Sequence, residues 1–315
     1  MQWHLEPTRE TTHGAFGRDI PPALTVDPGD TVTFRTLDAA WCLEPVILGR
    51  PKDQTPKLTP RNPDWTGHCL TGPVAIRGAK PGMVLEVQIN EILIGSWGWC
   101  SAGGWPHNNH KRLGFDTGEE VFHLYSLDRA NMTGTNQHGH TVKLRPFLGV
   151  MGMPDAQLGE HSTGPPRRTG GNLDCKELVA GTTLYLPIEV DGGIFSLGDG
   201  HAVQGDGEVC VTAIECPMER VSVTFNLRDD LDLKMPMAKT KDSWLTLGLH
   251  EDLQEATYLA IEGMLDLMGR EYPAIPRRDA YALASLAVDM RITQIANGVQ
   301  GVHAVLPFAA ISTRS

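Results

Sequence analysis

The stretch Met83-Val84-Leu85-Glu86-Val87-Gln88-Ile89 gives the clearest indication of the fold. Apolar and polar residues alternate along it with a period of two, and the turn residues Lys80-Pro81-Gly82 precede it, which is typical of a β-strand. The same pattern recurs in segments that we expect to be strands: Asp30–Arg35, Thr182–Ile188, Glu208–Ile214 and Val221–Phe225. Short strands between turn residues predict a β-rich fold.

The C-terminal part has a different, helical periodicity. Apolar residues recur at three- and four-residue spacing, which places them on one helical face: Leu253, Ala256, Ala260, Met264, Leu267 and Met268. Pro273 and Pro276 separate this helix from a second one expected over 279–295. The inward residues of the second helix would be Leu283, Leu286, Ala287, Met290 and Ile295. A last strand is expected over 301–307.

These patterns predict a mainly β fold with α (α+β): a β-sandwich-like core of short mixed strands with a C-terminal helical pair. No linker separates independent domains. We therefore expect a single domain over 1–315, β-rich over 1–245, with a helical segment over 250–298 packed on it.

Composition excludes several classes of function. The chain has 315 residues with 27 Lys plus Arg against 38 Asp plus Glu, a net charge of -11. Such a charge disfavours nucleic acid and anionic membranes as partners. No apolar run is long enough to span a bilayer, and the N-terminus MQWHLEPTRE lacks the features of a secretory signal. We expect a cytoplasmic protein. The six cysteines include no C-x-x-C pair, so they predict reduced, buried thiols.

The segment Gly198–Glu208 is the richest in chemistry. It reads GDGHAVQGDGE, so Asp199, His201, Asp206 and Glu208 fall among closely spaced glycines. Carboxylates with an imidazole suit a divalent cation such as zinc, and we expect them on a loop between a strand at Gly193–Leu197 and another from Val209. The alternative is a solvated acidic turn. The spacing does not match an EF-hand calcium loop.

Two other segments supply candidate residues. Gly170-Gly171-Asn172 can direct backbone and side-chain N–H groups at a developing oxyanion, and Asp174 can orient a neighbour or bind a cation. A surface turn is the alternative. His13 and Asp38 are candidates to complete a metal site from distant parts of the chain, although isolated residues of these types are more often structural. The pairs His138 with His140, and His107 with His110, rank below these candidates.

Motifs of the common nucleophilic enzymes are missing. The sequence contains no G-x-S-x-G, S-x-x-K or H-E-x-x-H pattern and no phosphate-binding glycine motif. A cysteine nucleophile remains an alternative, with Cys175 beside Lys176 and Glu177 as its best candidate. Cys210, in an expected apolar strand, is interpreted as inert packing.

Several longer stretches match the sequence pattern of a known family and occur in the same order along the chain. They include Thr12-His13-Gly14, Gly29-Asp30-Thr31-Val32, Leu70-Thr71-Gly72-Pro73-Val74, Trp97-Gly98-Trp99, Pro146 to Gly152, Gly170 to Asp174, and, as the most specific, Gly198 to Glu208. On these residues the chain resembles the acetamidase/formamidase family of amide hydrolases.

The resemblance implies hydrolysis of a short amide, such as formamide or acetamide, to a carboxylate and ammonia. Some relatives act on γ-lactams instead. It also implies a bound divalent metal without an organic cofactor, a cytoplasmic homo-oligomer (dimer or higher), and a largely β architecture with appended helices. Ala15 departs from the pattern, because many relatives have Trp beside the histidine.

Combining the candidate residues with the family resemblance gives a hypothetical mechanism. A zinc-like ion held by His201, Asp199 and Asp38, with His13 as a further candidate ligand, would activate a water; calcium as a structural ion is the alternative. Glu208 or Asp206 would be the general base and pass the proton to the leaving nitrogen. Asn172, with the two glycines before it, would bind the oxyanion.

The acyl group would lie in a small pocket walled by Trp97, Trp99 or Phe195. Two rival hypotheses remain: an enzyme with a cysteine nucleophile, and a non-catalytic, metal-stabilised protein that binds a small ligand.

Overall fold

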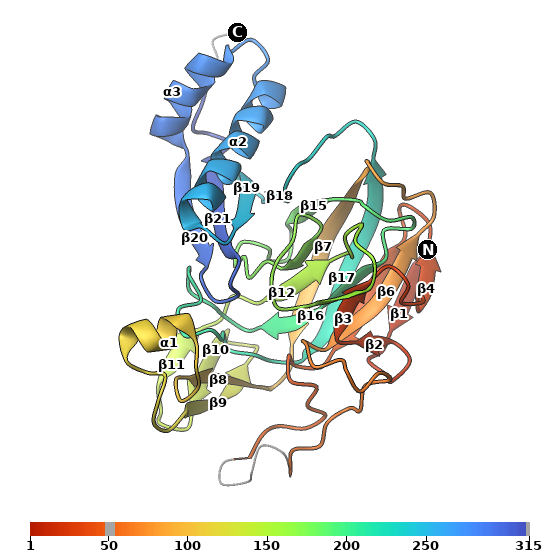
Figure 1. Cartoon of the computed structure of the whole chain (residues 1–315), viewed down its shortest axis with the longest axis vertical. Helices are drawn as coiled ribbons and strands as arrows, with labels where there is room; N and C mark the ends of the chain where they lie inside the picture. Colours follow the sequence, from red (N-terminus) through yellow and green to blue (C-terminus); the bar gives the residue numbers. More distant parts are fainter. Residues whose placement is uncertain (48–53, 313–315) are drawn as a thin grey trace.

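The computed structural model describes residues 1–47 and 54–312. Most of its regular structure is β, arranged in four sheets within these residues (Figure 1). The largest sheet contains, in spatial order, β1 (Gln2–Leu5), β5 (Thr31–Thr36), β17 (Met218–Arg228), β7 (Val84–Ile94), β15 (Thr183–Pro187), β18 (Met237–Lys239), β19 (Ser243–His250), β21 (Gln300–Pro307) and β20 (Asp289–Gln294). The mainly β prediction is confirmed.

Three smaller sheets complete the β part. A six-stranded sheet contains β14 (Gly170–Asn172), β12 (Phe147–Gly152), β16 (Phe195–His201), β6 (Leu70–Ile76) and β2 (Thr12–His13), with β4 (Leu24–Val26) beside β6. A four-stranded sheet contains β11 (Thr141–Lys143), β10 (Thr133–Asn136), β9 (Val121–Asp128) and β8 (Trp97–Ala102), and a two-stranded sheet joins β13 (Glu160–Ser162) to β3 (Ala15–Gly17). Parallel pairs (β1 with β5, β4 with β6) occur among antiparallel ones, as the mixed-strand prediction requires.

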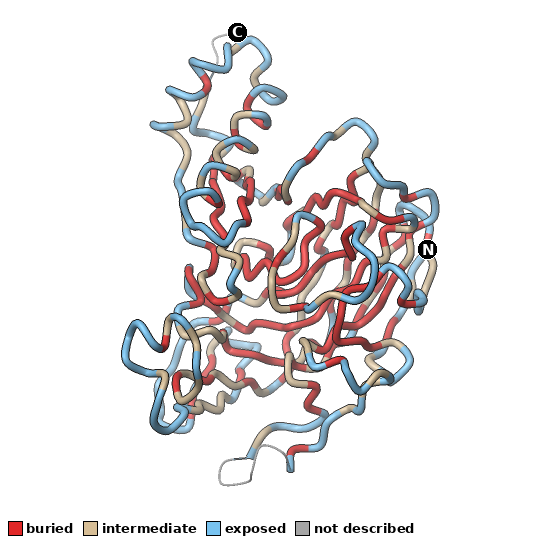
Figure 2. Tube along the Cα trace, viewed as in Figure 1, coloured by how far each residue is buried: buried red, intermediate tan, exposed pale blue. Residues whose placement is uncertain are grey.

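The nine-stranded and six-stranded sheets share one apolar core. Alternate residues of β5 point inward, with Val32 and Phe34 fully buried. Phe225 of β17 meets Phe195 of β16 edge to face, with ring centroids 5.1 Å apart. Figure 2 shows the buried segments concentrated on these inner strands. Burial of the inward faces of both sheets is the main source of stability for such a sandwich.

The helices lie outside the sandwich (Figure 1). They are α1 (Asn108–Leu113), α2 (Leu253–Glu271) and α3 (Arg277–Ala287). Asp252 caps α2 by accepting hydrogen bonds from the backbone N–H groups of Gln254 and Glu255. Five of the six residues predicted for the apolar face of α2 are buried, and only Leu253 is exposed. The helix packs on β19 and β21, and Thr246 Oγ1 donates to Ala260 O at 2.7 Å. None of the helices in the described ranges has the length and apolar character needed to cross a membrane.

The second predicted helix is wrong in its C-terminal half. The helix α3 ends at Ala287, and residues 289–294 instead form β20, antiparallel to β21. Leu286, expected to face inward, is 85% exposed. The β-branched Ile292 and Thr293 fit a strand. A short apolar pattern is compatible with a helix or with a strand, and here the pairing with β21 makes the segment a strand.

Two further predictions near the acidic motif are corrected. Gly198 to His201 belong to β16 and not to a loop, because the strand runs from Phe195 to His201. Glu208–Ile214 is not a strand but a turn followed by irregular backbone. Glycine at 198 and 200 permits close packing instead of a turn: a Cβ there would lie 2.3 Å from Cys69 O and 2.5 Å from Cys216 O, respectively.

Candidate functional site

The candidate site begins on β16, all of whose residues are buried. Asp199 and His201 are two positions apart, so their side chains lie on the same face of the sheet. Below them the neighbouring strand β12 has a glycine at position 149. A Cβ at that position would lie 2.4 Å from Asp199 Oδ2, 2.7 Å from Asp174 Oδ1 and 2.8 Å from His201 Cε1. Glycine at 149 therefore leaves the space in which three site side chains meet.

Asp174 enters this space just after β14. Its backbone N–H donates to Gly149 O at 3.2 Å, which joins it to the floor of the site. Its Oδ2 accepts a hydrogen bond from Asn297 Nδ2 at 2.6 Å, from the turn between β20 and β21. Within residues 1–47 and 54–312, Oδ1 has no hydrogen-bond partner, and it lies 4.0 Å from His201 Nδ1. One carboxylate oxygen is thus directed into the cluster without a donor.

Two glutamates reach the cluster from the segment between β16 and β17. Glu215 Oε1 accepts from Ala213 N at 2.9 Å, while Oε2 lies 3.3 Å from His201 Nε2 and has no hydrogen bond from the described residues. Glu208 is also buried. The ligand atoms of His201, Glu208 and Glu215 lie within 4.8 Å of one another, as do those of Asp174, Asp199 and His201. His201 is shared by both triads.

The hydrogen bonds of His201 determine which ring nitrogen carries the proton. Gln204 Nε2 donates to Asp174 O at 2.8 Å, so Gln204 Oε1, 2.9 Å from His201 Nδ1, must accept from it. In the neutral ring the lone pair is then on Nε2, which lies 3.4 Å from Asp199 Oδ2 as well as near Glu215. Histidines that bind metal ions have this arrangement, with the other N–H held by an outer acceptor.

Backbone strain coincides with the carboxylates. Asp174, Asp199 and Glu208 have φ values of 47°, 56° and 44°, in the left-handed region that non-glycine residues rarely adopt. Such conformations cost roughly 1–3 kcal/mol each and cluster at functional sites. The strain indicates that the positions of these side chains matter for more than stability.

The electrostatics favour a cation at the centre of the cluster. Burial raises the pKa of Asp174 and of Glu215 to about 7, and raises that of Glu208 well above its ordinary value. For His201, burial alone would lower the pKa, but the carboxylates of Glu215 and Asp199 outweigh it and raise the pKa. Buried like charges repel one another, and a divalent ion bound by these oxygen and nitrogen atoms would remove that cost. The donor set suits zinc.

The predicted site residues separate into two sets. Asp199, His201 and Glu208 meet in the cluster, and Asn172 is buried on β14, two residues before Asp174, with no hydrogen bond to its Oδ1 from the described part of the chain. Asp206 lies outside both triads and forms an ion pair with Lys176 at 2.9 Å. The N–H of Gly170 donates to Arg167 O at 2.9 Å, so it is not free to bind an oxyanion.

His13 and Asp38 also lie outside both triads. His13 Nδ1 pairs with Ala15 O at 2.6 Å and its Nε2 with Ser196 Oγ at 2.8 Å, and burial lowers its pKa to about 4. Asp38 accepts from Trp99 Nε1 at 2.8 Å and from Cys42 N at 2.7 Å, and burial raises its pKa. Both have the structural hydrogen bonds that are the usual alternative for such residues.

Sequence reasoning missed Glu215. Its signal was present, because a glutamate inside the apolar run Ala213-Ile214-Glu215-Cys216 is buried, and a buried carboxylate needs a partner. His68 was also missed. It is half-buried and directly precedes Cys69, whose carbonyl oxygen lies against Gly198, the neighbour of Asp199.

A cleft of about 750 Å³ opens beside the cluster, lined by described residues that include Ala15, Trp41, Trp65, His68 and Trp99. The cleft adjoins the cluster through Trp99, whose backbone exchanges hydrogen bonds with Glu215. The predicted pocket residues therefore differ in their roles. Trp99 lines the cleft, Phe195 is in the sandwich core, and Trp97 is not among the lining residues.

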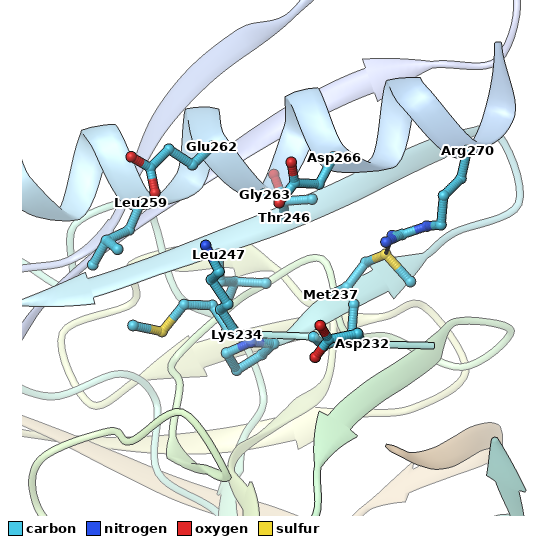
Figure 3. Close-up of a pocket in the computed structure, with 13 residues that line it drawn as sticks. Asp232, Lys234, Met237, Thr246, Leu247, Leu259, Glu262, Gly263, Asp266 and Arg270 are labelled. Atoms are coloured by element: carbon cyan, nitrogen blue, oxygen red, sulfur yellow. Dashed lines mark hydrogen bonds between the residues drawn. The ribbon is translucent and has the colours of Figure 1, made fainter. Parts of the chain in front are cut away.

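A separate cavity lies under α2, between Thr246, Gly263 and Arg270 (Figure 3). Its volume is about 30 Å³, which is room for one or two water molecules. None of the cluster residues lines it, so it is not the substrate site of the cluster.

Comparisons with known proteins identify the family of the chain. The sequence model of the acetamidase/formamidase family matches residues 2–163 and 155–308. A formamidase from Methylophilus methylotrophus is 51% identical over 247 residues, covering 62% of this chain and 59% of that protein. An acetamidase from Mycolicibacterium smegmatis is 25% identical over 258 residues, covering 62% of this chain and 61% of that protein.

The chain thus spans about three fifths of the length of these two relatives. The crystal structure of an acetamidase from Bacillus halodurans superposes with a TM-score of 0.84 at 27% identity, covering 96% of this chain and 97% of that one. Because the family match extends over nearly all of the sequence and the fold agrees, the chain belongs to the acetamidase/formamidase family of amidohydrolases.

Proposed function

We propose that this protein hydrolyses short primary amides, with formamide and acetamide as the first candidates, to a carboxylate and ammonia at the buried cluster. The observation that carries the proposal is the geometry of His201, whose Nδ1–H is held by Gln204 while Nε2 faces Asp199 and Glu215. The relatives named formamidase and acetamidase support the reaction class.

The residues that would hold a divalent ion, zinc by preference, come from the two triads and are Asp174, Asp199, His201 and Glu215, which leaves Glu208 for proton transfer. When bound, such an ion supplies Lewis acidity, which lowers the pKa of a water molecule and polarises the amide carbonyl. The unpaired oxygens Asp174 Oδ1 and Glu215 Oε2 fit this role.

Glu208 is the best candidate for proton transfer. Burial raises its pKa well above the ordinary value, so it can take up a proton during attack of water and give it to the departing nitrogen. Asp206, the other carboxylate expected in this role, is paired with Lys176 instead. The side-chain amide of Asn172 is the candidate donor to the oxyanion, because Gly170 N–H is already engaged.

The structure gives little support to a cysteine nucleophile at Cys175. This thiol is buried, and burial raises its pKa to about 12, so it carries almost no thiolate at neutral pH.

The test combines two measurements on the purified full chain: elemental analysis, and ammonia release from formamide and acetamide. We expect bound zinc, ammonia release, and loss of turnover after chelation that zinc restores. Full turnover by protein freed of metal would overturn the metal-dependent proposal. Bound metal without ammonia release would favour the rival ligand-binding protein.

Further properties stay predictions: action on γ-lactams, a cytoplasmic location, a homo-oligomeric state and a single-domain organisation. Light scattering on the purified protein measures the oligomeric state, and the same ammonia and ring-opening assays on a γ-lactam test the alternative substrate.

A further inference from the structure

The cleft beside the cluster is much larger than the smallest amides require. Its volume of about 750 Å³ falls in the range of roughly 300–1,000 Å³ that is typical of sites for drug-sized ligands. Formamide has only three heavy atoms. The cleft therefore has room for a substrate with a substantial acyl group.

Three tryptophans form the apolar walls of the cleft. Each indole N–H already donates to a protein acceptor: Trp41 to Gly67 O at 2.8 Å, Trp65 to Glu160 Oε2 at 2.7 Å, and Trp99 to Asp38 Oδ2 at 2.8 Å. These hydrogen bonds fix the rings and satisfy their polar ends. Trp41 and Trp65 are largely buried, and the ring of Trp99 stacks on Phe122 with centroids 5.6 Å apart. The indole surface that remains at the cleft is therefore held in a fixed position, which preorganises it for contact with a flat ring.

Small residues keep the cleft open between the indoles. A Cβ at Gly14 would lie 2.9 Å from Trp65 Cβ and 3.0 Å from Trp41 Cζ2, so only glycine permits this approach. Ala15 lines the same wall, where a larger side chain would reduce the volume.

The charges at the cleft favour a neutral acyl group. The lining residues include the cation of Lys57 and the carboxylates of Asp64 and Glu160, the last of which is hydrogen-bonded to Trp65. With two carboxylates and one lysine the cleft does not attract an anionic acyl group, and one of the carboxylates is already engaged by the Trp65 indole.

His68 connects the cleft to the chemistry. It lines the cleft, its Nδ1 lies 2.9 Å from Thr163 Oγ1, and the next residue, Cys69, lies against Gly198, the neighbour of Asp199. Trp99, which also lines the cleft, exchanges backbone hydrogen bonds with Glu215. A substrate in the cleft would thus have its amide at the His68 end, next to the cluster, and its acyl group among the tryptophans.

We propose that the preferred substrates are primary amides with a neutral aromatic acyl group, of the arylacetamide type. The proposal rests on the proposed function. The reaction is R–CO–NH₂ + H₂O → R–COO⁻ + NH₄⁺: the carbonyl carbon gains an oxygen from water, the C–N bond breaks, and the nitrogen leaves with the protons it needs. Because the leaving group is ammonia, the amide nitrogen has no substituent. Any large group of the substrate that lies in the cleft is therefore part of the acyl group.

The test compares kcat/KM for formamide, acetamide and phenylacetamide by ammonia release with the metal-loaded full chain. We expect phenylacetamide to exceed acetamide by at least about tenfold, the effect of one well-packed ring. Thr66→Trp, at an exposed position on the cleft, should reduce the phenylacetamide-to-acetamide ratio by at least about tenfold, whereas Thr117→Trp, at an exposed position outside it, should leave the ratio unchanged.

Binding of the product provides a second readout. Phenylacetate should quench tryptophan fluorescence at concentrations at least about tenfold below those needed for acetate, and Thr66→Trp should weaken its competition against substrate. If formamide and acetamide are hydrolysed but phenylacetamide is poorer than acetamide, or if Thr66→Trp leaves the ratio unchanged, the aromatic-substrate proposal alone is overturned. If no amide is hydrolysed, the proposed function fails, and the substrate proposal fails with it.

Discussion

Two parts of the cluster are held in different ways. Asp199 and His201 form a strand half, fixed by the register of β16 with β12. Glu208 and Glu215 form a loop half, on the segment between β16 and β17. This loop is not free, because Glu215 exchanges backbone hydrogen bonds with Trp99 of β8, and Gly207 N–H donates to Thr293 O of β20. An irregular segment can position ligands as firmly as a strand when its backbone bonds to neighbouring sheets at several points.

His201 lies in the strand half but belongs to both triads, so its loss should have the largest effect. We expect His201→Ala to lose the bound metal and to reduce amide turnover beyond the roughly 100-fold that removal of an outer-sphere partner costs. His138→Ala, at an exposed histidine, serves as the control. Metal content and ammonia release are measured together, with circular dichroism to confirm folding. A metal-free His201→Ala protein with wild-type turnover would exclude the proposed centre.

Gly149→Ala should displace the side chains of the strand half and leave the loop half unchanged. Its Cβ would collide with atoms of three site residues, the nearest at 2.4 Å, so we expect loss of metal and a destabilisation of about 1–3 kcal/mol from overpacking. Urea unfolding and elemental analysis measure the two effects. Gly205→Ala is the matched control in the loop, since a Cβ there meets nothing within 4 Å. Equal behaviour of the two variants would contradict the predicted role of Gly149.

Gln204→Leu should reveal how much the orientation of His201 contributes. The variant removes the acceptor for Nδ1–H and the donor to Asp174 O, but leaves every proposed ligand in place. We expect a loss of about 10- to 100-fold in metal affinity. Competition with a chromophoric chelator measures this affinity. Unchanged affinity would show that the hydrogen bond does not orient the ring.

Each half also has a buried, neutral histidine behind it. His13 pairs with Ser196 of β16, and His303 Nδ1 lies 2.8 Å from Thr293 Oγ1, beside the loop half. Burial lowers the pKa of both to about 4 from 6.5. Between these pH values the unfolded chain binds more protons, so stability is lost as the pH falls from about 6.5 to about 4, by up to about 3 kcal/mol for each histidine.

Urea unfolding at several pH values tests this smallest and most gradual effect. In His303→Gln, the fall in unfolding free energy between pH 6.5 and pH 4 should be smaller than in the wild type by up to about 3 kcal/mol. Identical pH dependence in the two proteins would mean that His303 does not remain neutral in the folded state.

The sequence predicted the fold class and four of the five cluster residues, all but Glu215, for physical reasons. Period-two alternation located β5, β7, β15 and β17 because one face of each strand is buried. Asp199, His201 and Glu208 were found because metal-capable side chains are close together in sequence. Glu215 comes from beyond the glycine-rich motif, and only the tertiary fold brings it to His201.

The errors have a common physical cause. Glycines 198 and 200 were interpreted as turn residues, but they serve close backbone contacts with Cys69 and Cys216, which no local pattern reveals. Likewise, β20 was assigned to a helix because its pairing with β21 is a tertiary interaction that overrides a short local pattern.

The hydrogen bond from Asn297 to Asp174 has a consequence for the order of folding. Asn297 and Asp174 are 123 residues apart in the sequence, and the backbone pairing of Gly207 with Gln294 also joins distant segments. Contacts between such distant segments form slowly, because a long loop must close before they can be made. A folding intermediate that has paired β16 with β12 but has not yet docked β20 and β21 would therefore contain most of the sheets and an incomplete centre.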